Sequence, residues 1–232
     1  MHSNHQCLQE LGLEAIVNFG FANWLIIGSE VLNAKGLNRA RGLVGAAVKA
    51  VMTHANSEGV VRPALKILAL LSSCRDDETT KGIAEIIQDC VAFEGGIEAV
   101  LVGLEAHLDS VEVQGLGLEA IVCLGGGISW AHTTQVSNEE SARTAANVNK
   151  FILEGGIKAV VAGLRAHLEH DLLQWSGFRA LKVLSFQSNK NQVISTGGLD
   201  AVLERGRGRG ITSVAADVLD ARRLASRRGL GR

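Results

Sequence analysis

The chain has 232 residues and a formal net charge of −1, so its overall charge favours neither nucleic acid nor an acidic membrane as a partner. Hydrophobic residues make up 47% of it, with no tyrosine and one proline, a composition that favours closely packed helices over a β-sandwich. The N-terminus lacks a signal-peptide layout, and asparagines and glycines interrupt the most apolar window, residues 15–32, so we expect no membrane span.

The chain repeats its own sequence. Residues 155–168 (GGIKAVVAGLRAHL) match residues 95–108 (GGIEAVLVGLEAHL) at ten of fourteen positions. Residues 11–17 (LGLEAIV) are identical to residues 116–122. Repetition of this kind is typical of an array of one supersecondary unit, whose copies stack to bury their apolar faces. We therefore predict an all-α solenoid.

Glycines at equivalent positions mark the predicted units in chain order. The units start at Gly42, Gly95, Gly155 and Gly197, and glycines at such starts are typical of joints where a helix stops. We predict a partial repeat over 1–41, repeats over 42–94, 95–154 and 155–196, a degenerate repeat over 197–224 and a basic tail over 225–232.

Two apolar stripes of helical period follow each start. In the unit that begins at Gly95, one stripe runs from Ile97 to Leu108 and the other from Leu118 to Leu124. This pattern predicts two amphipathic helices joined near residues 107–110. The longer units carry insertions after the second helix, over 72–94 and 125–154, and each insertion combines a polar loop with a further amphipathic helix. A capping box, Ser137-x-x-Glu140, opens the second of these helices.

Recurring histidines and scattered cysteines are the candidate metal ligands. His54, His107 and His167 lie one unit apart at predicted helix C-termini, where we expect them to interact with the last carbonyls and the helix dipole rather than with a metal. The four cysteines lack metal or disulfide spacing and are expected to be buried free thiols in the cytoplasm or the nucleus. No set of nucleophile, base and orienting group is evident, so we expect neither an enzyme nor a cofactor nor a small-molecule substrate.

The sequences at two joints between predicted units resemble the junction between successive armadillo repeats. In NVNKFILEGGIKAV (147–160) and LSFQSNKNQVISTGGL (184–199), an asparagine lies six residues before a Gly-Gly pair and an isoleucine three residues after that asparagine. The uninserted spacing from Gly155 to Gly197, 42 residues, is also the armadillo length. The resemblance spans roughly residues 8–224. It implies a right-handed α-solenoid of about four repeats whose third helices line a concave groove.

The groove implied by this resemblance departs from the family's peptide clamp. Armadillo proteins often hold an extended peptide with asparagines on the third helices and a tryptophan one turn earlier. The asparagine positions correspond to Asn18, Leu70, Cys123 and Val183. The tryptophan positions correspond to Glu14, Lys66, Glu119 and Arg179. We therefore expect a protein partner in the groove, a helix or a charged segment, in contact with Glu14, Asn18, Lys66, Glu119 and Arg179.

Two other segments carry candidate contacts. Trp130 and His132 lie in the inserted loop and either anchor a partner or fold back onto the edge of the array. Arg205, Arg207 and Arg209 alternate with glycines, as in arginine-glycine segments that bind RNA. The leading prediction is a non-enzymatic protein-protein interaction scaffold that does not bind membranes. The alternative is a nucleic-acid-associated accessory protein that uses these arginines.

Overall fold

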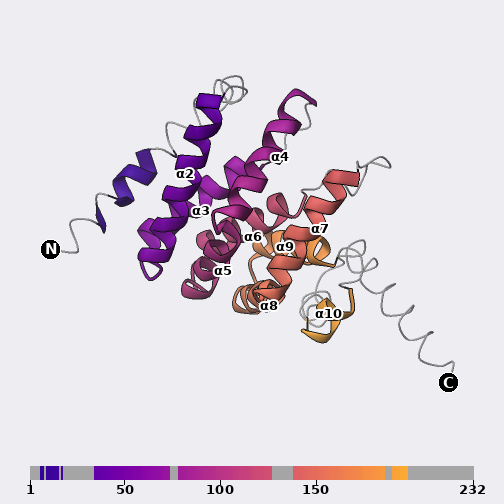
Figure 1. Cartoon of the computed structure of the whole chain (residues 1–232). Helices are drawn as coiled ribbons and strands as arrows, with labels where there is room; N and C mark the ends of the chain where they lie inside the picture. Colours follow the sequence, from indigo (N-terminus) through magenta and orange to yellow (C-terminus); the bar gives the residue numbers. More distant parts are fainter. Residues whose placement is uncertain are drawn as a thin grey trace.

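A computed structural model describes residues 6, 7, 9–15, 17, 34–73, 78–126, 138–185 and 190–197. In these residues the chain forms α-helices joined by turns, with no strand among them, so the predicted all-helical class is confirmed. Helical residues within 6–17 come first (Figure 1). The helices that follow are α2 (Ala34–Thr53), α3 (Glu58–Ser72), α4 (Glu78–Phe93), α5 (Gly96–Ala106), α6 (Val111–Leu124), α7 (Asn138–Leu153), α8 (Gly156–Ala166), α9 (Asp171–Leu184) and α10 (Lys190–Ser195).

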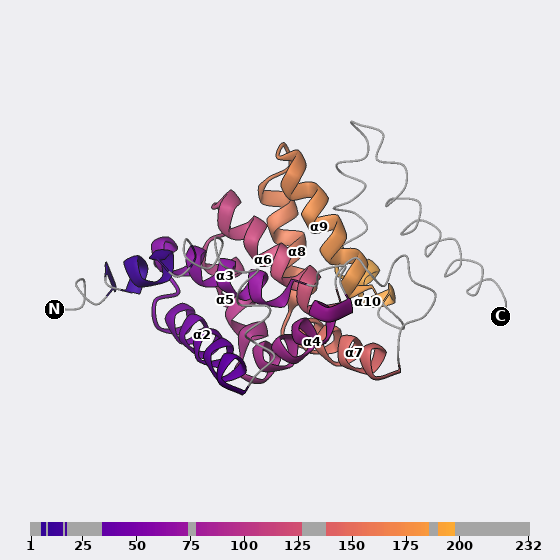
Figure 2. The same ribbon diagram turned by 90° about the horizontal axis from the view of Figure 1, so that it is seen from above.

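The helices recur in groups of three. By sequence, α5, α6 and α7 correspond to α8, α9 and α10, and equivalent helices pack on one another: α5 on α8, α6 on α9, and α4 on α7. Helix α3 packs on α6 and so extends the row formed by α6 and α9. In Figure 2, α2, α4 and α7 lie along the lower side of the molecule, and α6 and α9 lie above them.

In the units that the structure describes, over 42–196, the two predicted amphipathic helices are present, and their apolar stripes form one continuous core. Helix α5 ends at Ala106 and α6 begins at Val111, which confirms the joint predicted at 107–110. The Ser110 hydroxyl accepts a hydrogen bond from the Val113 amide at 3.3 Å and caps α6. The fully buried side chains of this region include Ile97, Leu104, Leu118, Ile121 and Leu124, together with Leu164, Phe178 and Leu181 one unit later.

Glycines in the left-handed conformation make the joints between units. Gly95 has a φ of 87° and Gly155 a φ of 89°. Glycine adopts this conformation at little energetic cost, whereas a residue with a Cβ is strained in it. The following residue must also be small, since a Cβ at Gly96 would lie 2.8 Å from the Val91 carbonyl oxygen. Gly42 is followed by leucine, and α2 runs through it without a break. The predicted repeat over 42–94 therefore does not begin with the glycine joint that begins the repeats at Gly95 and Gly155.

In the units that begin at Gly95 and Gly155, a buried glutamine closes the C-terminus of the first helix. Gln114 Nε2 donates to the carbonyls of Leu104 (2.7 Å) and His107 (3.1 Å), which lie at the end of α5. Gln174 makes the equivalent two bonds to the end of α8, at 2.7 and 3.0 Å. The last carbonyls of a helix have no partner within the helix, and a buried carbonyl needs one. These bonds fix how the two helices of a unit meet.

Two glycines of α6 give a matched test of the packing of α5 against α6. A Cβ at Gly117 would lie 2.5 Å from Leu104 Cδ2, whereas a Cβ at Gly115 would meet nothing within 4 Å. Leu104 is itself fully buried, so it cannot move aside freely. We expect Gly117→Ala to lower the free energy of unfolding by about 1–2 kcal/mol, because an overpacking cost of up to ~3 kcal/mol exceeds a helix-propensity gain of ~1 kcal/mol.

The control, Gly115→Ala, should raise the free energy of unfolding by up to ~1 kcal/mol, because it carries the propensity gain alone. Urea denaturation followed by circular dichroism measures both variants. Equal effects of the two substitutions would contradict the close approach of α5 and α6.

Candidate functional site

Three of the five predicted groove residues lie on one row of helices. Lys66, Glu119 and Arg179 occupy equivalent positions on α3, α6 and α9 and are all partly exposed. Glu14 lies in the N-terminal helical residues and is also partly exposed, whereas Asn18 falls outside the described residues. The outward surface of this row also includes Arg62, Gly115 and Trp175. We call it the α3/α6/α9 face.

Ion pairs link successive helices on this face. Arg62 of α3 contacts Glu14 (Nη2 to Oε1, 2.6 Å) on one side and Glu112 of α6 (Nη1 to Oε2, 3.4 Å) on the other. Arg179 of α9 contacts Glu119 of α6 (Nη1 to Oε2, 3.2 Å). Glu119–Arg179 joins two positions of the charged column predicted from the sequence, whereas Arg62 and Glu112 lie outside that column.

Of the four positions that the resemblance aligns with armadillo asparagines, Asn18 falls outside the described residues and two of the other three are buried. Cys123 of α6 and Val183 of α9 are buried, and Leu70 of α3 is partly buried. None of these three side chains has an amide, so they cannot bind an extended backbone in the way that a ladder of asparagines does. The described part of this face is a row of charged and apolar side chains.

Trp175 belongs to this face, although the sequence analysis did not single it out. It lies on α9 one turn before Arg179, and 51% of it is exposed. The equivalent position of α6 is Gly115, which leaves open space above that helix, and the equivalent of α3 is Arg62. Tryptophan is enriched among the residues that anchor protein interfaces. The signal available in the sequence was its four-residue separation from Arg179, which places both on one helix face.

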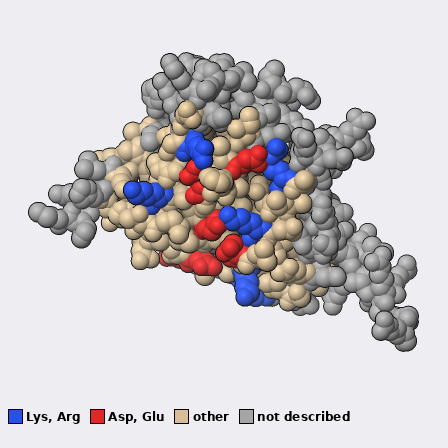
Figure 3. Space-filling view, viewed as in Figure 1, with Lys and Arg blue, Asp and Glu red and all other residues tan. Residues whose placement is uncertain are grey.

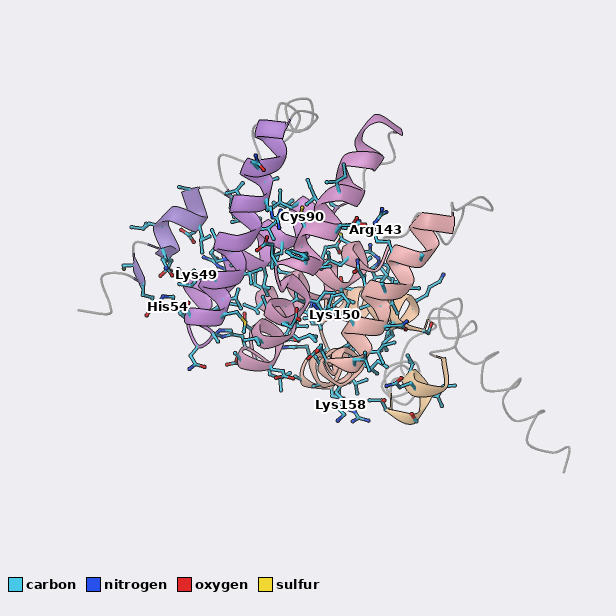
Figure 4. The ribbon with its side chains drawn as sticks, viewed as in Figure 1. Lys49, His54, Cys90, Arg143, Lys150 and Lys158 are labelled. Carbon is cyan, nitrogen blue, oxygen red and sulfur yellow. The ribbon has the colours of Figure 1, made fainter. Side chains whose placement is uncertain are left out.

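The row on the opposite side carries ion pairs of its own. Figure 3 shows acidic and basic side chains interspersed over that side, and Figure 4 labels Arg143 and Lys150 on α7. Arg143 reaches Asp89 of the preceding unit, whereas Lys150 pairs with Glu98 of α5 in its own unit and donates to the Ala92 carbonyl of the preceding one. The pairs are Arg41–Glu94, Arg143–Asp89 and Lys150–Glu98, at 2.8, 2.7 and 2.8 Å. Arg143–Asp89 joins α7 to α4 of the preceding unit, and Lys150–Glu98 joins α7 to α5 of the same unit, so these charges tie packed helices together both within and between units.

The recurring histidines bond to the preceding unit rather than to their own helix. His107 Nε2 lies 2.8 Å from the Ala55 carbonyl oxygen, and His167 Nε2 lies 2.8 Å from that of Leu108. We expected these histidines to contact the last carbonyls of their own helices. For His107 and His167 this expectation is wrong, because the carbonyl bound belongs to the preceding turn. Each histidine is the C-cap, where the chain has left helical geometry, so its ring reaches the neighbouring turn. Within the described ranges, no group of three or more His, Cys, Asp or Glu side chains could hold a metal.

The cysteines differ in exposure. Cys123 is buried and Cys90 is partly buried, but Cys7 is exposed, so the expectation of buried thiols is wrong for Cys7. Cys74 falls outside the described residues. Burial raises the pKa of the Cys90 thiol, the Arg41 guanidinium opposes this, and nearby carboxylates add to it. Because the thiolate is the reactive form, Cys90 is a poor nucleophile at neutral pH.

Five of the predicted contact residues fall outside the described residues. These are Trp130 and His132 of the inserted loop and Arg205, Arg207 and Arg209 of the arginine-glycine segment. Their roles stay predictions from the sequence.

A scan against protein-family models and searches of curated proteins and solved structures found no match for the chain. In the part of the chain that the structure describes, no helix has both the length and the hydropathy needed to cross a bilayer. The function has to follow from the surfaces that the helices and turns present.

The pair Glu119–Arg179 can be tested by exchanging its charges. Glu119→Arg alone brings two cations together and should lower the free energy of unfolding by about 0.5–1 kcal/mol, the range for a partly exposed pair. The double exchange Glu119→Arg with Arg179→Glu should restore most of that loss and leave helicity nearly unchanged. Urea denaturation of the four proteins of this cycle measures the coupling. A double variant that loses the sum of both single changes would contradict the pair.

Proposed function

We propose that this protein is a non-enzymatic interaction scaffold, an armadillo-type right-handed solenoid of about four repeats that binds a helical or charged segment of a partner protein. The binding surface is the α3/α6/α9 face. The observation that supports this most is Trp175, a half-exposed tryptophan on a row of ion-paired charges.

The physical case for binding rests on preorganisation. Long charged side chains lose rotamer freedom when a partner immobilises them, and this loss opposes binding. On this face Arg62 and Arg179 are already held by carboxylates of neighbouring helices. A partner that docks there meets side chains whose positions are largely set. Burial of the exposed part of Trp175 would add apolar contact next to them.

The nature of the partner follows from the same side chains. Opposite charges alternate along the face, so a uniformly charged polyanion or polycation gains little from it. Cys123 and Val183 are buried at the positions where asparagines would hold an extended backbone. A helix with its own mixed charges fits these features better than an extended basic peptide. The absence of catalysis stays a prediction from the sequence.

A photo-crosslinking amino acid tests the proposal. Placed at Gly115, it occupies open space on the α3/α6/α9 face, since a Cβ there would meet nothing within 4 Å. Gly42 of α2 is equally open and serves as the control position. After irradiation in extracts of the source cells, we expect a discrete protein adduct from position 115 and none from position 42.

A second substitution separates a specific adduct from nonspecific labelling. Trp175→Ala should reduce the adduct at position 115 by about tenfold or more, since an anchoring tryptophan is typically worth ~2 kcal/mol or more. Adducts of equal yield from both positions, or an adduct indifferent to Trp175→Ala, would refute binding at this face.

A further inference from the structure

The turns that join the first and second helices of each unit lie side by side. His107 binds the carbonyl of Ala55 in the α2–α3 turn, and His167 binds that of Leu108 in the α5–α6 turn, both at 2.8 Å. Turns 54–57, 107–110 and 167–170 therefore form one continuous border. We call this border, with the adjoining helix ends, the turn edge.

Large apolar side chains are exposed along the turn edge. Leu108 and Leu168 hold equivalent positions in neighbouring turns and are both exposed. Val111 begins α6 and is exposed, and Leu172, near the start of α9, is 75% exposed. Single exposed leucines are ordinary, but several that gather on adjacent turns form a patch of the kind that marks an interaction site. Trp175 lies one turn further along α9.

The same edge has an excess of carboxylates. Residues 54–58, 105–112 and 165–172 contain one arginine, Arg165, and six exposed acidic residues: Glu58, Glu105, Asp109, Glu112, Glu169 and Asp171. Of these, Glu112 is paired with Arg62 of α3, and Glu58 accepts a hydrogen bond from the Ser110 hydroxyl. Carboxylates in the first turn of a helix favour its dipole, which accounts for Glu58, Glu112 and Asp171.

Helix stability does not account for the other three carboxylates. Asp109 and Glu169 lie in the turns, and Glu105 lies in the last turn of α5, where the dipole disfavours a negative charge. Glu105 and Asp109 are therefore the carboxylates of this edge that are best placed to meet an external cation.

We propose that the turn edge binds a basic amphipathic helix of a partner protein, with its leucine-type face on Leu108, Leu168 and Leu172 and its lysines or arginines against the carboxylates. This surface adjoins the α3/α6/α9 face of the proposed function and shares Glu112 with it, but its excess of carboxylates defines a partner of different charge. Spacing favours a helix. Packed helices lie about 8–10 Å apart, and residues i and i+7 of a helix lie ~10.5 Å apart on one side, so two such residues meet neighbouring turns.

The probe is a synthetic leucine-lysine amphipathic helix about five turns long, labelled with a fluorophore and titrated with the full chain. Fluorescence anisotropy should show binding at low salt that weakens strongly at high NaCl concentration, because screening reduces the attraction. A leucine-glutamate peptide of the same pattern should not bind. Equal binding of the two peptides would overturn the proposal.

Matched variants locate the site. Leu172→Ser should weaken binding about tenfold, while Leu153→Ser, which changes an equally exposed leucine at the end of α7, should leave it unchanged. Glu105→Gln should weaken binding roughly twofold to fivefold, and Glu154→Gln, outside the edge, should not. If each control weakens binding as much as its partner variant, the peptide binds elsewhere and the proposal fails.

The chain's own arginines are the competing occupant. Changing Arg205, Arg207 and Arg209 to glutamine should leave the affinity for the leucine-lysine helix unchanged if the edge is open to a partner. A clear gain in affinity would mean that the arginine segment covers the edge, and this would overturn the proposal of a separate partner. Photo-crosslinking at Gly115 does not depend on these residues, so the two proposals can fail independently.

Discussion

Stacking of one unit on the next is the constraint on which the rest of the structure depends, because a group of three short helices cannot bury both of its apolar stripes alone. The stacking is close. A Cβ at Gly103 of α5 would lie 3.0 Å from Leu65 and Val61 of α3 in the preceding unit. Since the described units meet their neighbours through equivalent positions, each surface position recurs one helix spacing further on, with its own residue in each unit. Both proposed binding surfaces are consequences of this repetition.

Charge is distributed differently over the three surfaces that the stacking creates. On the two helix rows, cations and carboxylates of neighbouring helices face each other, as in Arg179–Glu119 and Lys150–Glu98. At the turn edge, six exposed carboxylates accompany one arginine. Paired charges make a surface that selects partners by pattern, whereas an unbalanced edge attracts partners of one sign at longer range. A net charge of −1 for the whole chain conceals this difference.

The candidate site was only partly predictable from the sequence. Alignment of the repeats placed Lys66, Glu119 and Arg179 in one column, and the structure has them on packed helices. Alignment did not show that Glu119 and Arg179 would bind each other, because a pairing across 60 residues depends on side-chain reach as well as register. It also passed over Trp175, since the equivalent residues are a glycine and an arginine and no column of aromatic residues marks the position.

The sequence by itself determined the helices, the joint between α5 and α6 and the unit length, because periodicity, N-caps and Gly-Gly pairs act over a few residues. Two local features were decided by finer detail. Helix α2 runs through Gly42 and Leu43 without a joint, and His107, the C-cap of α5, bonds to the turn of the preceding unit. Only the tertiary structure decided which turns become neighbours, which charges are paired and which apolar side chains stay exposed. Those outcomes depend on contacts between residues some 50 to 60 positions apart. A local sequence pattern does not show which residues so far apart in the chain lie close together in space.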